Sequence, residues 1–268
     1  FGGRGRRNRR RAAATILATQ PVPTGGLIAQ ALIAALIVGV LSGMWNGLLV
    51  SFVGMQPIIA TLILMVAGRG IAQLLTAGQI IPIGAPGYLF VGGGYWLGVP
   101  CSVWIATLAV LATAALVEGT ALGLFIRAIG VNPVATRLVG LRSKALVFAV
   151  YGFSGLTAAM AGILISSNVR SADGNNAGLL LELDAILAVT LGGTSLLGGR
   201  FSLAGTVLGA LIIQTLTYTT YSIGVPPEAT LVVKAAVVLT VSVIQSPAAR
   251  ALAMSFGMQM IKQRGVAR

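Results

Sequence analysis

Long apolar stretches, separated by shorter segments rich in glycine, proline or charge, dominate the chain. A helix that crosses the hydrocarbon core of a bilayer needs about 20 predominantly apolar residues. Seven stretches reach or approach this length, at 27–53, 57–75, 100–117, 145–166, 183–199, 203–223 and 229–244. The pattern therefore predicts an all-α, polytopic bundle of transmembrane helices.

Glycines modify two of these stretches. Gly39, Gly43 and Gly47 repeat every four residues in the first one, which predicts close packing against a neighbouring helix. The stretch at 183–199 is the shortest and is rich in glycine towards its end. It could cross the membrane, or it could be a re-entrant half helix that lines a cavity, with a backbone able to bend.

Basic residues orient the helices, because lysine and arginine accumulate on the cytoplasmic side of a membrane. We place the connection 118–144 in the cytoplasm and count the connections and the tail, without the first 26 residues. Nine basic residues then lie inside, and only Arg170 lies outside. This bias favours a true span at 183–199, since a re-entrant segment would put the basic C-terminus outside.

Composition agrees with a membrane protein. Hydrophobic residues make up 56% of the chain and charged residues 9%, and the mean hydropathy is +0.95. Soluble domains carry about 25% charged residues, so a cytosolic enzyme, a secreted domain and a disordered protein are excluded. With no histidine and one cysteine, we expect no metal site and no internal disulfide.

The N-terminus conflicts with this topology. Six of the 18 basic residues are arginines within the first 11 residues, a run that could bind anionic lipid or nucleic acid. Seven spans with a cytoplasmic C-terminus would place these arginines outside. We therefore expect residues 1–26 to be disordered or non-native, residues 27–245 to form the transmembrane domain and residues 246–268 to form a basic cytoplasmic tail, with no nucleic-acid partner.

The connection 118–144 contains a short helix signal. Asn132 can accept N-cap hydrogen bonds, and Pro133 suits the first helical position. Ala135 and Leu138 would share one face, and Gly140 would end the helix. Such a helix could dock a cytoplasmic partner, and a solvated connector fits the pattern equally well.

Four segments carry a family resemblance. AIGVNPVATRLVG at 128–140 and ELDAILAVTLGGTSLLGGR at 182–200 resemble the permease subunits of ribose-type ABC sugar importers. PIIATLILMVAGRGIAQ at 57–73 and ADGNNAG at 172–178 resemble galactofuranose-type permeases. The resemblance extends over residues 27–245.

The resemblance implies a multi-pass permease of the bacterial inner membrane that imports a galactofuranose- or ribose-like monosaccharide. It implies about ten spans in a complete subunit. Because seven are predicted here, we expect about three N-terminal helices to be absent. It also implies a second permease subunit, identical or paralogous, a periplasmic sugar-binding protein and cytoplasmic ABC ATPase subunits that bind ATP and magnesium. The chain itself has no phosphate loop, so we expect no cofactor and no enzymatic activity. The coupling-loop candidates are Arg127, Gly130, Asn132, Ala135, Arg137 and Gly140.

Polar side chains at membrane depth are candidates for the substrate path, because such residues are costly there. They are Asn46, Arg69, Gln73, Glu182 and Asp184. Snorkelling, ion pairs and polar contacts between helices are the alternatives. Candidates for contact with the binding protein are Asp173, Asn175 and Asn176, which would otherwise form a plain polar loop.

Two other functions stay open. A secondary transporter or channel would need an ion- or proton-coupling group at depth, and the sequence has no histidine and five acidic residues. An inert fragment is the other alternative, if the absent helices are needed for assembly.

Overall fold

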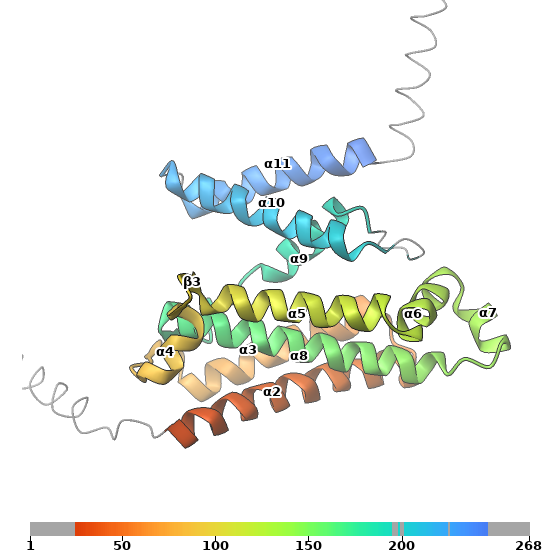
Figure 1. The fold of residues 1–268 in the computed structure, drawn as a ribbon, viewed down its shortest axis with the longest axis horizontal. Helices are drawn as coiled ribbons and strands as arrows, with labels where there is room; N and C mark the ends of the chain where they lie inside the picture. Colours follow the sequence, from red (N-terminus) through yellow and green to blue (C-terminus); the bar gives the residue numbers. More distant parts are fainter. Residues whose placement is uncertain (1–24, 195–197, 199–200, 225, 246–268) are drawn as a thin grey trace, which may run out of the picture. The chain divides into compact units, whose positions relative to one another are not determined.

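The computed structural model describes residues 25–194, 198, 201–224 and 226–245, and helices form most of them (Figure 1). Most of the N-terminal segment 1–26 and the tail 246–268 lie outside the described residues. The expectations for those two segments therefore stay predictions.

The chain forms two compact units. Among the described residues, unit 1 comprises those up to 109 and those from 147 to 177, and unit 2 comprises those from 110 to 146 and those from 178 onward. Unit 1 holds α2 (Gly25–Leu48) with its π-helical continuation η1 (Leu49–Val53), α3 (Pro57–Thr76), α4 (Pro86–Gly93), the first half of α5 (Cys101–Glu118) and most of α8 (Ser143–Val169). Unit 2 holds the rest of α5, α6 (Ala121–Val131), α7 (Pro133–Leu138), α9 (Leu181–Leu191), α10 (Leu203–Ser222) and α11 (Pro227–Gln245).

The predicted helical membrane fold is confirmed. Among the described residues, five helices are long and apolar enough to cross a bilayer: α2 with η1, α3, α5, α8 and α10. They coincide with five of the seven predicted spans. α11 also forms where a span was predicted, and its 19 residues rise about 28 Å at 1.5 Å per residue. Its crossing of the membrane stays a prediction.

Of the two alternatives for the stretch at 183–199, a continuous spanning helix is not observed, because α9 (Leu181–Leu191) ends at Leu191. Gly193 has a φ of +79° and donates its N–H to Thr190 O at 3.0 Å, while Thr194 N–H reaches Val189 O at 3.2 Å. This is a Schellman C-cap, which glycine favours because it adopts a left-handed φ without a Cβ clash. The 11 residues of α9 rise only about 16 Å, which fits the half-helix alternative.

The segment at 77–99, between the second and third predicted spans, contains a short helix and short strands. α4 begins at Pro86, a residue suited to the first turn of a helix, and its Gly92 N–H donates to Ser167 Oγ of α8 at 2.8 Å. Short strands β1 (Ile81–Pro82) and β4 (Ser171–Ala172) pair antiparallel, as do β2 (Tyr95–Trp96) and β3 (Val99–Pro100). Contacts with α8, distant in sequence, organise this segment.

The connection predicted at 118–144 contains more helix than expected. It contains α6 as well as the expected short helix. Thr120 caps α6 by accepting the Leu122 N–H at 3.3 Å. Gly123 lies so close to the Val117 carbonyl that a side chain there would clash, which allows the chain to fold back after α5. The four basic residues lower the hydropathy of the connection, so the pattern did not predict the apolar helix α6.

The predicted glycine contact in the first span is confirmed. Gly43 of α2 lies against Gly155 of α8, and a Cβ built at Gly43 would stand 2.9 Å from Gly155 Cα. Gly47 is similarly tight against Phe148. Small residues thus let the α2 and α8 backbones approach closely in unit 1.

Candidate functional site

The coupling-loop candidates gather around α7 in unit 2. Asn132 Oδ1 accepts the backbone N–H groups of Val134 and Ala135, each at 3.0 Å, and Pro133 occupies the first helical position. Gly140, with a φ of +86°, ends the helix: its N–H reaches Arg137 O at 3.0 Å. The predicted cap, first residue and stop of this helix are all confirmed.

The surface of α7 is apolar and exposed. Leu138 and Val139 have 85% and 82% of their surface exposed, and Val134 is also exposed. Thr136 is buried on the opposite side of the helix. The sequence predicted that Ala135 and Leu138 share one face, and the two valines were not included in that prediction although they are apolar residues of the same connection.

Arg137 is bonded to the start of α8. Its Nε donates to Ser143 Oγ at 3.2 Å, and Ser143 is a buried residue at the first turn of α8. The bond joins the end of α7 to a helix that could cross the membrane. Arg137 therefore connects α7 to α8, and the apolar residues of α7 form an exposed surface.

The glycine-rich segment after α9 meets the same region. Gly198 lies against the Gly130 carbonyl at the end of α6, too close for any side chain at position 198. The Arg127 guanidinium stands 5.9 Å from the centre of the Phe201 ring, a cation–π geometry. Gly198 and Phe201 thus both lie against the end of α6 within unit 2.

Asp184 of α9 and Lys234 of α11 form an ion pair that their separation in sequence did not suggest. Lys234 Nζ donates to both carboxylate oxygens, at 2.7 and 2.9 Å. The Asp184 side chain is 26% exposed and the Lys234 side chain is 12% exposed. Asp184 also stands in the first turn of α9, where the helix dipole favours a negative charge. Glu182, its neighbour in that turn, is exposed.

Asn46 is the candidate path residue with an unused polar atom. Only 7% of its surface is exposed, and its Oδ1 has no hydrogen-bond partner in the part of the chain that the structure describes. A buried acceptor without a donor costs stability. The amide oxygen of Asn46 is available to a hydroxyl or amine donor.

Arg69 and Gln73 share one face of α3, since they stand four residues apart. Arg69 is half-buried and Gln73 is exposed. Both belong to unit 1, whereas Glu182 and Asp184 belong to unit 2. The pairing of Arg69 with an acidic residue stays a hypothesis.

The three candidates for binding-protein contact form one turn after β4. Asp173 Oδ1 accepts the N–H groups of Asn175 at 2.8 Å and Asn176 at 3.2 Å, and Asn175 Nδ2 donates to Gly78 O at the end of α3. The Asn175 N–H holds the pKa of Asp173 below its usual value; desolvation opposes this shift, and the bonds from Asn176 add to it. The Asp173 carboxylate therefore stabilises its own turn.

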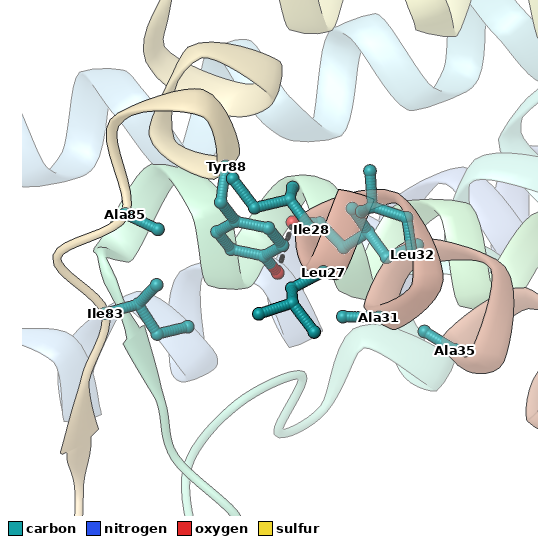
Figure 2. Close-up of a pocket in the computed structure, with 9 residues that line it drawn as sticks. Leu27, Ile28, Ala31, Leu32, Ala35, Ile83, Ala85 and Tyr88 are labelled. Carbon is teal, nitrogen blue, oxygen red and sulfur yellow. Dashed lines mark hydrogen bonds between the residues drawn. The ribbon is translucent and has the colours of Figure 1, made fainter. Parts of the chain in front are cut away.

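A groove of about 310 Å³ in unit 1 holds none of these candidates (Figure 2). It is lined by apolar side chains of α2 and α8 and by residues 83–88. Its Tyr88 hydroxyl is already bonded to Ser166 Oγ. The lining offers little that could bind the hydroxyl groups of a sugar.

Comparison with known proteins supplies the wider context. A family model described as the permease component of branched-chain amino acid transport systems matches residues 12–242. The galactofuranose transporter permease protein YtfT of Escherichia coli is 51% identical over 80% of this chain and 63% of its own length. The fructose import permease protein FruF of Bifidobacterium longum is 41% identical over 88% and 67%, respectively.

The ribose import permease protein RbsC of Escherichia coli is 39% identical over 81% of this chain and 68% of its own length. The chain thus spans about two thirds of the length of these relatives, and slightly less of YtfT. No solved structure matches the chain.

Proposed function

Because the chain belongs to the family of branched-chain amino acid transport permease components, we propose that it is the membrane-spanning permease subunit of an ATP-driven sugar importer. Its relatives named for galactofuranose, fructose and ribose support a monosaccharide as the substrate, in particular a galactofuranose- or ribose-like sugar. The resemblance stated from the sequence is confirmed at the level of the family. The subunit would lie in the bacterial inner membrane with its C-terminus in the cytoplasm.

The observation that carries this proposal is the α7 turn. It is a capped helix of six residues between α6 and the start of α8, and it exposes Val134, Leu138 and the following residue Val139. Exposed apolar residues on a connection are costly in water, so a partner protein is their natural environment. A cytoplasmic ATPase subunit is the partner that the family indicates.

The contacts around α7 offer a route for coupling. Arg137 bonds to Ser143 at the start of α8, and Gly130 touches Gly198 beyond the end of α9. A displacement of α7 by the ATPase would therefore reach α8 and the glycine-rich segment directly. ATP and magnesium would be bound by the ATPase, and this subunit would contribute no catalytic residue.

The sugar would pass along residues that offer polar atoms at membrane depth. Asn46 has an unused buried acceptor, and Arg69 with Gln73 forms a polar face on α3. We assign Asp184 to the ion pair with Lys234, which holds α9 against α11. A periplasmic binding protein would deliver the sugar near the turn formed by residues 173–176, and a second permease subunit would complete the cavity.

Transport in cells tests the proposal. The full-length permease, expressed with its ATPase and binding protein, should restore uptake of labelled galactofuranose or ribose to a strain that lacks its own importers. Uptake should require ATP and the binding protein and should survive collapse of the proton gradient. Uptake that follows the proton gradient and ignores the ATPase would identify a secondary transporter and overturn the proposal.

A further inference from the structure

The segment before α5 ends in a small aromatic hairpin. β2 and β3 pair Tyr95 with Pro100 and Trp96 with Val99. Cys101 N–H also donates to Gly94 O at 2.8 Å, which closes the hairpin onto the start of α5. The hairpin is therefore a formed element directly at the end of a helix long and apolar enough to cross a bilayer.

The tip of this hairpin has an unusual residue. Leu97 and Gly98 have φ angles of +53° and +78°, the left-handed pair of a type I′ turn. Asparagine, aspartate or glycine usually stands at the first of these positions, because a leucine there is strained. Leu97 also leaves 78% of its surface exposed. Neither the turn nor an aqueous environment explains a leucine at this position.

The residues beside it share this exposure. Tyr95 leaves 70% of its surface exposed, and Trp96 is also exposed. Trp96 packs edge-on against Trp104 at 5.9 Å between ring centres, and Trp104 Nε1 donates to the Trp96 carbonyl at 3.3 Å. Trp104 continues into the exposed apolar face of α5 through Leu108, four residues later. The hairpin thus extends the face of α5 that membrane lipid would cover.

The distribution of charged residues also favours a lipid environment for the hairpin. Between Arg69 and Glu118 the sequence has no lysine, arginine, aspartate or glutamate. The connections 118–144 and 167–182 both carry charged residues. A connection that stood in water would gain solubility from such residues, whereas this segment presents tyrosine, tryptophan and leucine.

We propose that the tip of the β2–β3 hairpin, Tyr95–Gly98, inserts into the headgroup layer of the bilayer and anchors the N-terminal end of α5. Tyrosine and tryptophan favour this layer because their rings are apolar and their polar groups reach water. Leu97 would extend beneath the headgroups, where its exposed side chain is favourable. The proposal goes beyond transport: it needs only that α5 crosses a bilayer.

Tryptophan fluorescence can test this directly, because the chain has three tryptophans, Trp45, Trp96 and Trp104. W45F/W104F retains only Trp96, and W45F/W96F retains only Trp104. Each full-length variant would be reconstituted in vesicles of phosphatidylcholine and phosphatidylglycerol, with lipid brominated either near the headgroup or near the middle of the acyl chain. Iodide in the buffer would report exposure to water.

We expect Trp96 to be quenched more by the shallow bromines than by the deep ones, and only weakly by iodide. Trp104 should be quenched relatively more by the deep bromines. Strong iodide quenching of Trp96 without bromolipid quenching would place the hairpin in water, as for a protein-docking loop, and would overturn the proposal. Protection of Trp96 from both quenchers would also overturn it, since the hairpin would then be covered by protein.

L97N in the W45F/W104F background separates insertion from folding, because asparagine suits the left-handed turn position. We expect this variant to lose bromolipid quenching and gain iodide quenching at Trp96. An unchanged pattern would overturn the role of Leu97. None of these readouts involves sugar or ATP, so they can fail or succeed independently of the transport assay.

Discussion

Replacing Asn132 with alanine should loosen α7 without unfolding the membrane helices. The substitution removes the Oδ1 that accepts two backbone N–H groups at 3.0 Å. Loss of an N-cap typically costs about 1 kcal/mol, which is roughly a fivefold change in an equilibrium constant. Because α7 has only six residues and stands between larger helices, the cost should appear as local opening.

Hydrogen exchange followed by mass spectrometry measures that opening. In N132A, the amides of the α7 peptide, including Thr136 and Leu141, should exchange about fivefold faster, with peptides of α8 and α10 unchanged. N132D is the matched control, because aspartate is an equally good cap, and it should exchange like the parent protein. Equal exchange in all three proteins would refute the claim that the Asn132 cap holds α7 in place.

Three further predictions follow from packing and charge. G43A should weaken the α2–α8 contact and lower the thermal stability of the protein in detergent, because a Cβ there would stand 2.9 Å from a Cα of α8, whereas G68A meets open space and should not. D184A should destabilise the α9–α11 contact by about 1–3 kcal/mol, between the values for exposed and buried ion pairs, because the pair is partly buried. The double variant D184A/K234M should recover most of this loss in a thermal unfolding assay, and no recovery would contradict the pairing. The lowered pKa of Asp173 contributes stability that is present above the usual carboxylate pKa of about 3.9 and is lost as the pH falls through the lower folded value. The protection of the 173–176 amides, measured relative to their intrinsic exchange rate at each pH, should therefore fall in acid, and D173N should remove that pH dependence of the protection.

Local signals in the sequence predicted the elements whose ends depend on nearby residues. Asn132, Pro133 and Gly140 define α7 through caps that involve only their neighbours, so the helix formed as expected. The glycine repeat of α2 likewise predicted a close helix contact, although it did not identify α8 as the partner.

Elements that depend on distant residues could not be predicted in this way. α4 is bonded to Ser167, which follows it by 75 positions, and the Asp184–Lys234 pair spans 50 positions. α9 shows a different difficulty. Its apolar residues continued the hydropathy of a span, while the Gly192–Gly193 pair ended the helix, and backbone geometry decided between the two.

The candidate sites also differ in whether they depend on nearby or on distant residues. The cap and the end of α7 were predicted because capping is a local property. The exposed Val134 and Val139 lie in the same connection but were not selected, because the exposure of a side chain depends on the whole structure. For the substrate path, the sequence selected polar residues at depth, and the structure separated Asn46, with its unused acceptor, from Asp184, which is paired.

Copurification of the ATPase subunit with the full-length permease tests the central claim most directly. L138D places a charge on the exposed apolar surface of α7 while leaving the Asn132 cap and the Arg137–Ser143 bond in place. L179D is the matched control, since Leu179 is an exposed leucine outside this surface. We predict that L138D inserts into the membrane but loses the ATPase, whereas L179D retains it. Full retention of the ATPase by L138D would contradict the assignment of α7 as the docking surface.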